Sequence, residues 1–307
     1  MALWQEGREV YADQWQGYGV DDCVHVMSVT KSVVSLLVGI GLDLGLIDSV
    51  EQPVLDFFPA YQPKRGEKTI QQVRLRHLLT MTAPYKYRHE PWSKVCSSDD
   101  WTLAALDLLG GRSGLDGTSK YSTLGIHILS GILAGASGLN TVDFANKYLF
   151  GPLGIAPRVN YLAETAQEHK QLIIAKQPRG PMWICDPQGV GAAGFGLCLS
   201  AGEMAKLGQL CLDGGCWQGK RLVSAQWIAE STRPRSQWDE SFAHMGYGYL
   251  WWTPDMHDPA YAALGNSGNV IYIDPPRRAV AAVAANFKPT VLDRVDFIKQ
   301  HLLPLLD

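Results

Sequence analysis

The sequence predicts an α+β protein in which an antiparallel sheet, built from both ends of the chain, is flanked by helices and carries an inserted, mainly helical domain. Two patterns predict this fold class. Strand-like segments lie near the N-terminus and after residue 245, and helical patterns broken by Pro and Gly fill the middle of the chain. A chain of 307 residues, 46% hydrophobic and 19% charged, is long enough to bury the core that this fold needs.

The N-terminal residues begin the sheet and lead into a core helix. Residues 2–15 have the pattern of two short strands around a turn at residues 6–8, which is typical of an edge hairpin. Helical spacing of apolar residues then begins after Ser28 and ends in the glycines and aspartates of "GLDLGLIDS". The apolar positions are Val29, Val33, Leu36, Leu37 and Ile40. We therefore expect a helix that starts at or next to Ser28.

The middle of the chain predicts the inserted domain. Segments such as "DWTLAALDLLGG" and "YSTLGIHILSGILAGASG" have helical spacing, and few alternating strand patterns occur between them. We expect residues 57–194 to form this mainly helical insertion. Residues 1–56 and 195–307 would then form one discontinuous sheet domain.

Strand patterns return in the last quarter of the chain. The segments "GYGYLWWTP", "AYAALGNSGNVIYID" and "AVAAVAANF" are rich in Tyr, Val and Ile and predict three antiparallel strands. The last two are joined through residues 275–278. The segment "TVLDRVDFIKQHLLPLL" predicts a closing helix.

Composition argues against several classes of partner. A net charge of −3 provides no basic face for nucleic acid or for an anionic membrane surface, and the longest apolar segment is interrupted by Asp43. The six cysteines have irregular spacing without a CxxC pair, and the N-terminus lacks a signal-peptide pattern, so we expect a reduced, cytoplasmic protein. The eight histidines form no metal-binding motif, and we expect no metal site. For His25 we expect a buried or supporting role.

The tetrapeptide "SVTK" is the first candidate for chemistry. Residues at i and i+3 lie on one face of a helix, so Ser28 and Lys31 can bring a hydroxyl and an amine within hydrogen-bonding reach. Lysine can activate a serine only if burial or positive potential lowers its pKa, and a helix N-terminus in an apolar run offers both. A backbone N–H there can also stabilise an oxyanion. Since S-x-x-K occurs about once by chance in a chain of this length, Ser28 as a simple N-cap stays open.

Two later segments can complete such a site. Tyr121 begins the helical pattern "YSTLGIHILSGIL", where its phenol can relay a proton to a leaving group. The segment "LGNSGNVIYIDP" predicts a strand entered through Gly265 and Gly268, where small residues let a substrate approach the backbone. A main-chain N–H near Asn269 is then the expected second oxyanion donor.

In order, these segments resemble the S-x-x-K, Y-x-N and K-T-G or H-x-G motifs of the penicillin-recognising serine hydrolases. These are the class C β-lactamases, the D-alanyl peptidases, and the related esterases and 6-aminohexanoate-dimer hydrolases. Connecting segments such as "LRHLLTMTA" and "LFGPLGI" extend the resemblance over nearly the whole chain. It implies a β-lactamase-like fold with the site in the seam between domains. It also implies Ser28 as the acylated nucleophile, Lys31 as its proton acceptor and Tyr121 as general acid and base, without a cofactor.

The sequence departs from this family pattern in two motifs. Thr123 replaces the asparagine that orients an acylamino side chain, and Asn266 replaces the cationic lysine or the histidine, followed by Ser267 and Gly268. A neutral amide cannot pair with the carboxylate of a penicillin as a lysine does. We therefore expect these four residues, with Trp183 as a pocket wall, to bind a small ester or amide.

Three functions follow from the sequence, and a serine esterase or amidase is favoured. A β-lactamase or D-alanyl carboxypeptidase is the first alternative, although export would be expected of it. A binding module that kept the fold and lost turnover is the second, and the intact Ser28, Lys31 and Tyr121 argue against it. Residues 88–90 are expected on a solvated loop without a role. The sequence predicts no oligomeric state.

Overall fold

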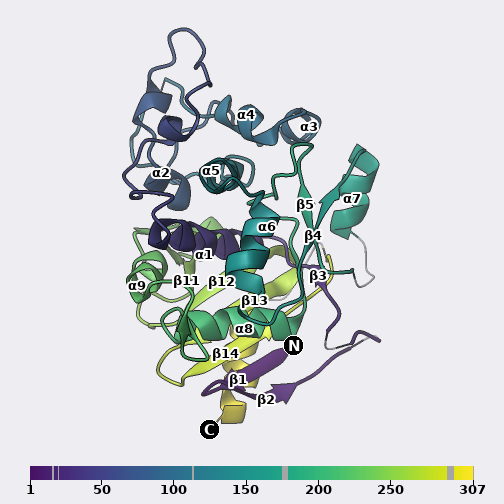
Figure 1. The fold of residues 1–307 in the computed structure, drawn as a ribbon. Helices are drawn as coiled ribbons and strands as arrows, with labels where there is room; N and C mark the ends of the chain where they lie inside the picture. Colours follow the sequence, from purple (N-terminus) through teal and green to yellow (C-terminus); the bar gives the residue numbers. More distant parts are fainter. Residues whose placement is uncertain (16, 20, 113, 175–178, 289–293, 307) are drawn as a thin grey trace.

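An eight-stranded antiparallel sheet forms the centre of the protein, with strand order β2-β1-β14-β13-β12-β11-β10-β9 (Figure 1). The computed structural model describes residues 1–15, 17–19, 21–112, 114–174, 179–288 and 294–306. The strands are β1 (Ala2–Gln5), β2 (Arg8–Ala12), β9 (Ser236–Gln237), β10 (Gly246–Tyr247), β11 (Trp252–Thr253), β12 (Tyr261–Gly265), β13 (Asn269–Asp274) and β14 (Ala279–Val283). The N-terminal hairpin pairs with β14, which confirms that both chain ends build one sheet.

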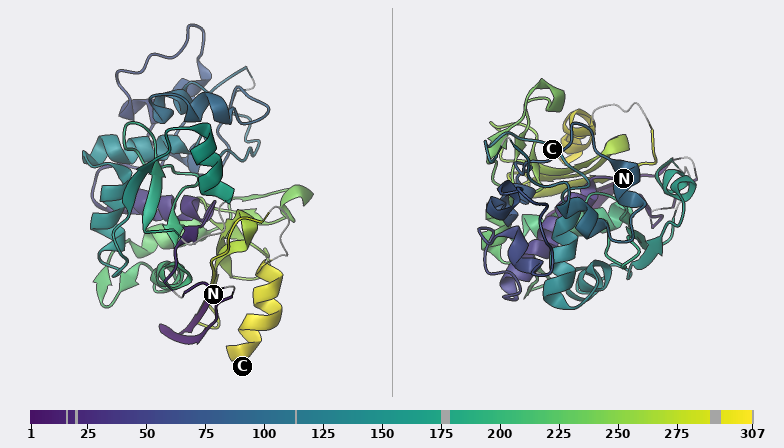
Figure 2. Two further views of the ribbon diagram at one scale, coloured as in Figure 1. Left: turned by 90° about the vertical axis from the view of Figure 1, so that its right-hand side faces the viewer. Right: turned by 90° about the horizontal axis from the view of Figure 1, so that it is seen from above.

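Helices cover both faces of this sheet. Alternate residues of β13 point to opposite faces, so Ile271 belongs to the main core whereas Val270 and Tyr272 belong to a second apolar cluster. The second cluster is closed by the C-terminal segment, which comprises α10 (Arg294–Phe297), η6 (Ile298–Leu302) and η7 (Leu303–Leu306) and stands beside the strands in Figure 2. The closing helix is thus confirmed over residues 294–306. The expected start at residues 290–293 lies outside the described residues.

The opposite face carries α1 (Val29–Asp43), α8 (Ala201–Leu212) and α9 (Ala225–Thr232) (Figure 1). Helix α8 lies across β1, β13 and β14, and α1 packs between β12 and α5. Two short pairs of strands lie outside the main sheet on this side, β3 (Val24–His25) with β6 (Cys198–Leu199) and β7 (Cys216–Trp217) with β8 (Lys220–Arg221). Helix α1 is therefore fixed between the sheet and the helical part of the molecule.

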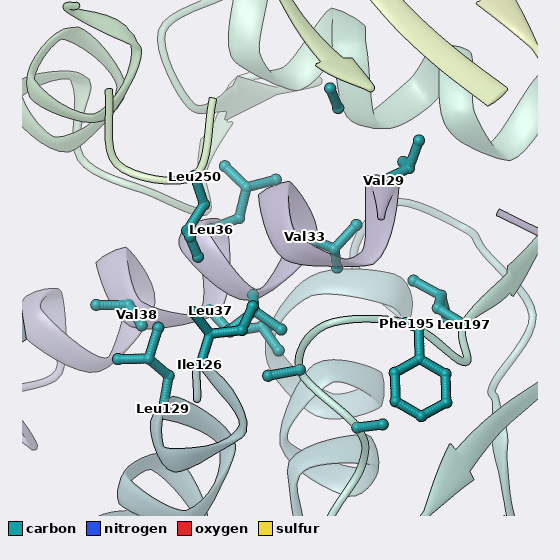
Figure 3. Packing of buried hydrophobic residues seen from close by; sticks show 14 of the residues in the cluster. Val29, Val33, Leu36, Leu37, Val38, Ile126, Leu129, Phe195, Leu197 and Leu250 are labelled. Atoms are coloured by element: carbon teal, nitrogen blue, oxygen red, sulfur yellow. The ribbon is translucent and has the colours of Figure 1, made fainter. Parts of the chain in front are cut away.

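Helix α1 begins directly after Ser28, as the sequence predicts. All of its residues from Val29 to Gly41 are buried, because the apolar residues of this helix surround its axis rather than forming one stripe. Figure 3 shows it enclosed by side chains from three other segments: Ile126, Leu129, Phe195, Leu197 and Leu250. A helix packed on all sides holds its first turn rigidly.

Residues 57–194 lie outside the main sheet and are mainly helical, as expected (Figure 1). They hold most of the chain's short helices: η1 (Val54–Phe57) at the border, η2 (Thr69–Gln72), α2 (Leu75–Leu79), α3 (Trp92–Cys96), α4 (Trp101–Leu106), α5 (His127–Ser137), α6 (Thr141–Ala145), η3 (Asn146–Phe150) and α7 (Ala166–Ile174). A parallel pair, β4 (Val159–Leu162) and β5 (Met182–Cys185), also belongs to this part. The division into two domains at residues 56/57 and 194/195 stays a prediction.

The structure corrects the expected course of two strands. The segment 260–274 is a hairpin, not one strand, because Ser267 and Gly268 take left-handed φ values of 68° and 81° and reverse the chain. Gly265 of β12 therefore pairs with Asn269 of β13. The segment "GYGYLWWTP" is likewise two strands, β10 and β11, with Leu250 at a φ of 63° between them.

Candidate active site

Ser28 and Lys31 meet at the start of α1. Met27 has a left-handed φ of 52° in the turn that leads from β3 into this helix. Ser28 occupies the N-cap position, yet its hydroxyl makes no capping hydrogen bond to α1, all of whose residues are described. Instead it accepts a hydrogen bond of 2.7 Å from the Lys31 Nζ. The contact favours the nucleophile-and-base interpretation of "SVTK" over a simple helix cap.

Three acceptors surround the Lys31 amine. Besides Ser28 Oγ, it donates to the carbonyl oxygen of Gly194 at 2.8 Å and to the Thr123 Oγ1 at 3.3 Å. The side chain is buried, with 2% of its residue surface exposed. Burial lowers the pKa of Lys31 to about 7, while the charge of Glu90 acts in the opposite direction. Near neutral pH the amine can therefore lose a proton and serve as a base.

Tyr121 completes this group from the turn that precedes α5. Its ring centre lies 4.8 Å from the Lys31 Nζ, and the Ser28 side chain lowers the pKa of its phenol against the larger effect of burial. Burial raises the pKa of Tyr121, so the phenol carries its proton at neutral pH. Three aromatic side chains pack around the ring: Trp238, Phe242 and Trp252. The structure thus brings together Ser28, Lys31 and Tyr121, as the sequence predicts.

The third predicted segment reaches the site through Gly265. A Cβ built on Gly265 would overlap the carbonyl oxygen of Val26 and would lie 3.1 Å from the backbone nitrogen of Ser28, so only glycine permits this approach. Asn269 lies on the neighbouring strand and lines the same cavity as Gly265, and its side-chain amide is bonded to the main chain of Asn266 and Ala285. Its backbone N–H as the second oxyanion donor stays a prediction.

The residues predicted to bind substrate divide into two groups. Thr123 contacts Lys31, and Asn266 is exposed on the wall of a cavity of about 700 Å³ that Gly265 also lines. Ser267 is buried, and its hydroxyl is bonded to the main chain of Lys288, so it holds the turn rather than facing substrate. Gly268 lies under the Arg294 side chain and lines the same cavity as Asn266.

Trp183 is not a pocket wall. Its side chain is fully buried, and its indole N–H donates to the carbonyl oxygen of Ala192. The expectation is wrong because β5 points this residue into the core. His25 is buried, as expected, and its Nε2 accepts the backbone N–H of Gly196 at 2.7 Å.

Two charged residues near the site were missed by the sequence analysis. Glu90 accepts hydrogen bonds from the segment that carries Tyr121, and Arg294 lines the cavity beside Asn266. The partners of Glu90 on that segment lie more than 30 residues later in the chain, and Arg294 follows the third motif by a similar distance. No local spacing connects either residue with the motifs.

The described residues hold no metal-binding cluster and no single helix that could span a membrane. Among those residues, no group of three or more His, Cys, Asp or Glu side chains could hold a metal ion. No single described helix is long and apolar enough to cross a membrane. The bent pair formed by α5 and α6–η3 reaches the required length and hydropathy only when its two parts are taken together. Most residues of that pair are buried in the core.

The family model described as Beta-lactamase matches residues 1–303. This chain belongs to the β-lactamase family. The β-lactamase-like fold expected from the sequence is thereby confirmed. Across 292 aligned residues, the chain is 25% identical to a 6-aminohexanoate-dimer hydrolase of Paenarthrobacter ureafaciens, covering 88% of this chain and 68% of that protein.

Solved structures of hydrolases with different names share this fold. A class C β-lactamase from Rhodobacter sphaeroides is similar with a TM-score of 0.71 and 17% identity, covering 100% of this chain and 94% of that one. A family VIII carboxylesterase is similar with a TM-score of 0.68 and 18% identity, covering 94% of this chain and 86% of that one. The family contains hydrolases of several substrate classes, so the fold alone does not select one.

Proposed function

We propose that this β-lactamase-family protein is a serine hydrolase that forms an acyl-enzyme at Ser28, with small esters or amides as substrates. The observation that carries the proposal is the 2.7 Å contact between the Lys31 Nζ and the Ser28 Oγ, made where burial lowers the lysine pKa to about 7. The names of two relatives, a 6-aminohexanoate-dimer hydrolase and a carboxylesterase, support hydrolysis of an amide or ester.

Acylation follows from the hydrogen bonds of the lysine. An uncharged amine has two N–H donors and one lone pair. Its donors are used by Gly194 O and Thr123 Oγ1, and the lone pair then accepts the Ser28 proton as Ser28 Oγ attacks the substrate carbonyl carbon. The negative charge that develops on the carbonyl oxygen would be stabilised by the Ser28 backbone N–H, at the point where Gly265 of β12 lies next to it.

We assign the second proton transfer to Tyr121. Its ring lies beside the Lys31 amine and Ser28 acts on the pKa of its phenol, so Tyr121 can protonate the leaving alcohol or amine and be reprotonated from Lys31. The carbon–oxygen or carbon–nitrogen bond of the substrate breaks as the acyl–Ser28 bond forms. Water then attacks the acyl carbon and gives a proton to the same pair of residues. That proton passes to Ser28 Oγ as the acyl–Ser28 bond breaks, which releases the acid and restores the Ser28 hydroxyl.

The cavity beside Gly265 is the proposed substrate site. Its volume of about 700 Å³ lies within the range of about 300–1,000 Å³ typical of small-molecule sites. Thr123, already bonded to Lys31, replaces the amide that would orient an acylamino side chain, which favours a simpler ester or amide. Arg294 in the cavity wall favours a second candidate, a carboxylate-bearing β-lactam, because it provides a cation that Asn266 does not.

The test is intact-protein mass after reaction with a fluorophosphonate, with Ser28→Ala as the variant. Ser32→Ala is the matched control, since Ser32 lies one turn later on α1 and its hydroxyl donates to the Leu250 carbonyl instead. We expect labelling of the wild type and of Ser32→Ala, and none of Ser28→Ala. Equal labelling of Ser28→Ala would refute the proposal.

Substrate class is tested with p-nitrophenyl esters and nitrocefin. Faster turnover of the esters supports the esterase or amidase. Turnover of nitrocefin far above that of the esters would overturn the substrate assignment in favour of a β-lactamase. An acyl-enzyme that persists with every substrate would instead identify a binding module.

A further inference from the structure

The segment that carries Tyr121 is held against residues 81–90 by a series of contacts. The backbone N–H of Lys120 donates to the carbonyl oxygen of Met81 at 2.7 Å, and its side chain donates to the carbonyl oxygen of Tyr87. A Cβ on Gly125 would overlap the ring of Tyr85, so the two segments pack closely only because this residue is glycine. The position of Tyr121 is thus set by residues 81–90.

Glu90 is the charged residue in this contact. Its Oε1 accepts the backbone N–H of Leu124 at 2.8 Å and the hydroxyl of Ser122 at 3.2 Å, and Tyr87 contributes a longer contact of 3.4 Å. Ser122 in turn accepts the backbone N–H of Gly125 at 2.8 Å. One carboxylate oxygen therefore binds the chain on both sides of Thr123, directly after Tyr121.

Electrostatics link the same carboxylate to the proposed base. Glu90 is the charged group that acts on Lys31, and it raises the pKa of Lys31 against the stronger effect of burial. The charge of Glu90 also acts to raise the pKa of Tyr121 and that of Lys120. The other titratable groups affected by its charge are Tyr85, Tyr87 and Cys96.

We propose that Glu90 is a positioning residue, whose carboxylate aligns Tyr121 and Thr123 with Lys31 and whose negative charge sets the pH range in which Lys31 acts. The inference rests on the proposed function of Ser28 and Lys31. It replaces, for Glu90 alone, the expectation that residues 88–90 have no role. Glu90 acts through its neighbours, because its contacts are with the main chain and hydroxyls behind the site.

Two substitutions separate its two effects. Glu90→Gln keeps an oxygen that can accept the Leu124 N–H but removes the charge. Because the charge raises the pKa of Lys31, its loss should shift the acid limb of the rate of Ser28 labelling to lower pH, with rates on the plateau within a few-fold of the wild type. Glu90→Ala also removes the acceptor and should lower the plateau rate by roughly ten- to a hundred-fold, as small misplacements of reacting groups do.

Glu67→Gln is the matched control. Glu67 likewise accepts main-chain N–H groups, at Thr69 and Gly111, but its charge does not appear among the influences on Lys31. We expect Glu67→Gln to leave the pH profile of labelling unchanged, even where it lowers the melting temperature. The inference would be overturned if the pH profile of Ser28 labelling were the same for Glu90→Gln as for Glu67→Gln. If Glu90→Ala fails to fold, the comparison of these two glutamine variants decides the question.

The experiment also separates this inference from the proposed function. Wild-type protein that no fluorophosphonate labels at Ser28 would refute the proposed function itself. Wild-type protein that is labelled, with a pH profile insensitive to Glu90→Gln, would refute only the role of Glu90.

Discussion

The pKa of Lys31 gives the sharpest prediction for this protein. An ordinary lysine has a pKa of 10.5, and burial lowers that of Lys31 to about 7, a difference of about 3.5 units. Each unit corresponds to about 1.4 kcal/mol, so burial destabilises the charged amine by on the order of 5 kcal/mol. At pH 7 about half of the Lys31 amines would be uncharged, against roughly one in 3,000 at the ordinary pKa. The fraction of Lys31 that is uncharged and able to accept a proton is therefore about a thousand-fold higher than for an ordinary lysine.

The assay is the rate constant of fluorophosphonate labelling of Ser28 from pH 5 to pH 10. We expect the rate to rise through about pH 7 and then to stay constant, since the uncharged lysine is the active form. Lys31→Arg keeps a cation that cannot be deprotonated in this range. It should lower the plateau rate by roughly a hundred- to ten-thousand-fold, the usual contribution of a general base.

Two results would refute this reasoning. A rate that keeps rising through pH 10 would mean that Lys31 titrates as an ordinary lysine or does not limit the reaction. A Lys31→Arg variant with the wild-type rate and profile would mean that another group takes the Ser28 proton. The melting temperature of each variant, measured at the same pH values, shows whether the change is in the chemistry or in the fold.

Two further substitutions test other parts of the structure. Gly265→Ala places a Cβ against the Val26 carbonyl oxygen and should lower the rate of ester hydrolysis by up to about a hundred-fold. The control is Gly135→Ala, on an open helix face, which should leave that rate unchanged. Equal rates for the two variants would argue against the role of Gly265 in the site. Glu203→Ala leaves the fully buried Arg158 without its ion-pair partner and removes one of the two hydrogen bonds of the α8 capping box, the one from the Ser200 backbone N–H. Urea unfolding should show a loss of about 3–5 kcal/mol, and an unchanged unfolding midpoint would contradict this.

The sequence alone determined the features that depend on short separations. The start of α1 after Ser28 and the reach of Lys31 back to Ser28 follow from helical spacing, which operates over three or four residues. The N-terminal hairpin follows from alternation around a short turn. Tyr121 was predicted by its place before a helical pattern and by resemblance, and the structure brings its ring centre within 4.8 Å of the Lys31 Nζ.

The tertiary structure decided what depends on distant segments. Only packing shows that Gly265 lies against the Ser28 amide, and that a left-handed turn at residues 267–268 puts Asn269 on the neighbouring strand. Trp183 points into the core, and Glu90 binds a segment more than 30 residues away. The basicity of Lys31 is likewise a tertiary property: spacing brings the amine to the hydroxyl, but only burial by distant segments removes the water that would keep it charged.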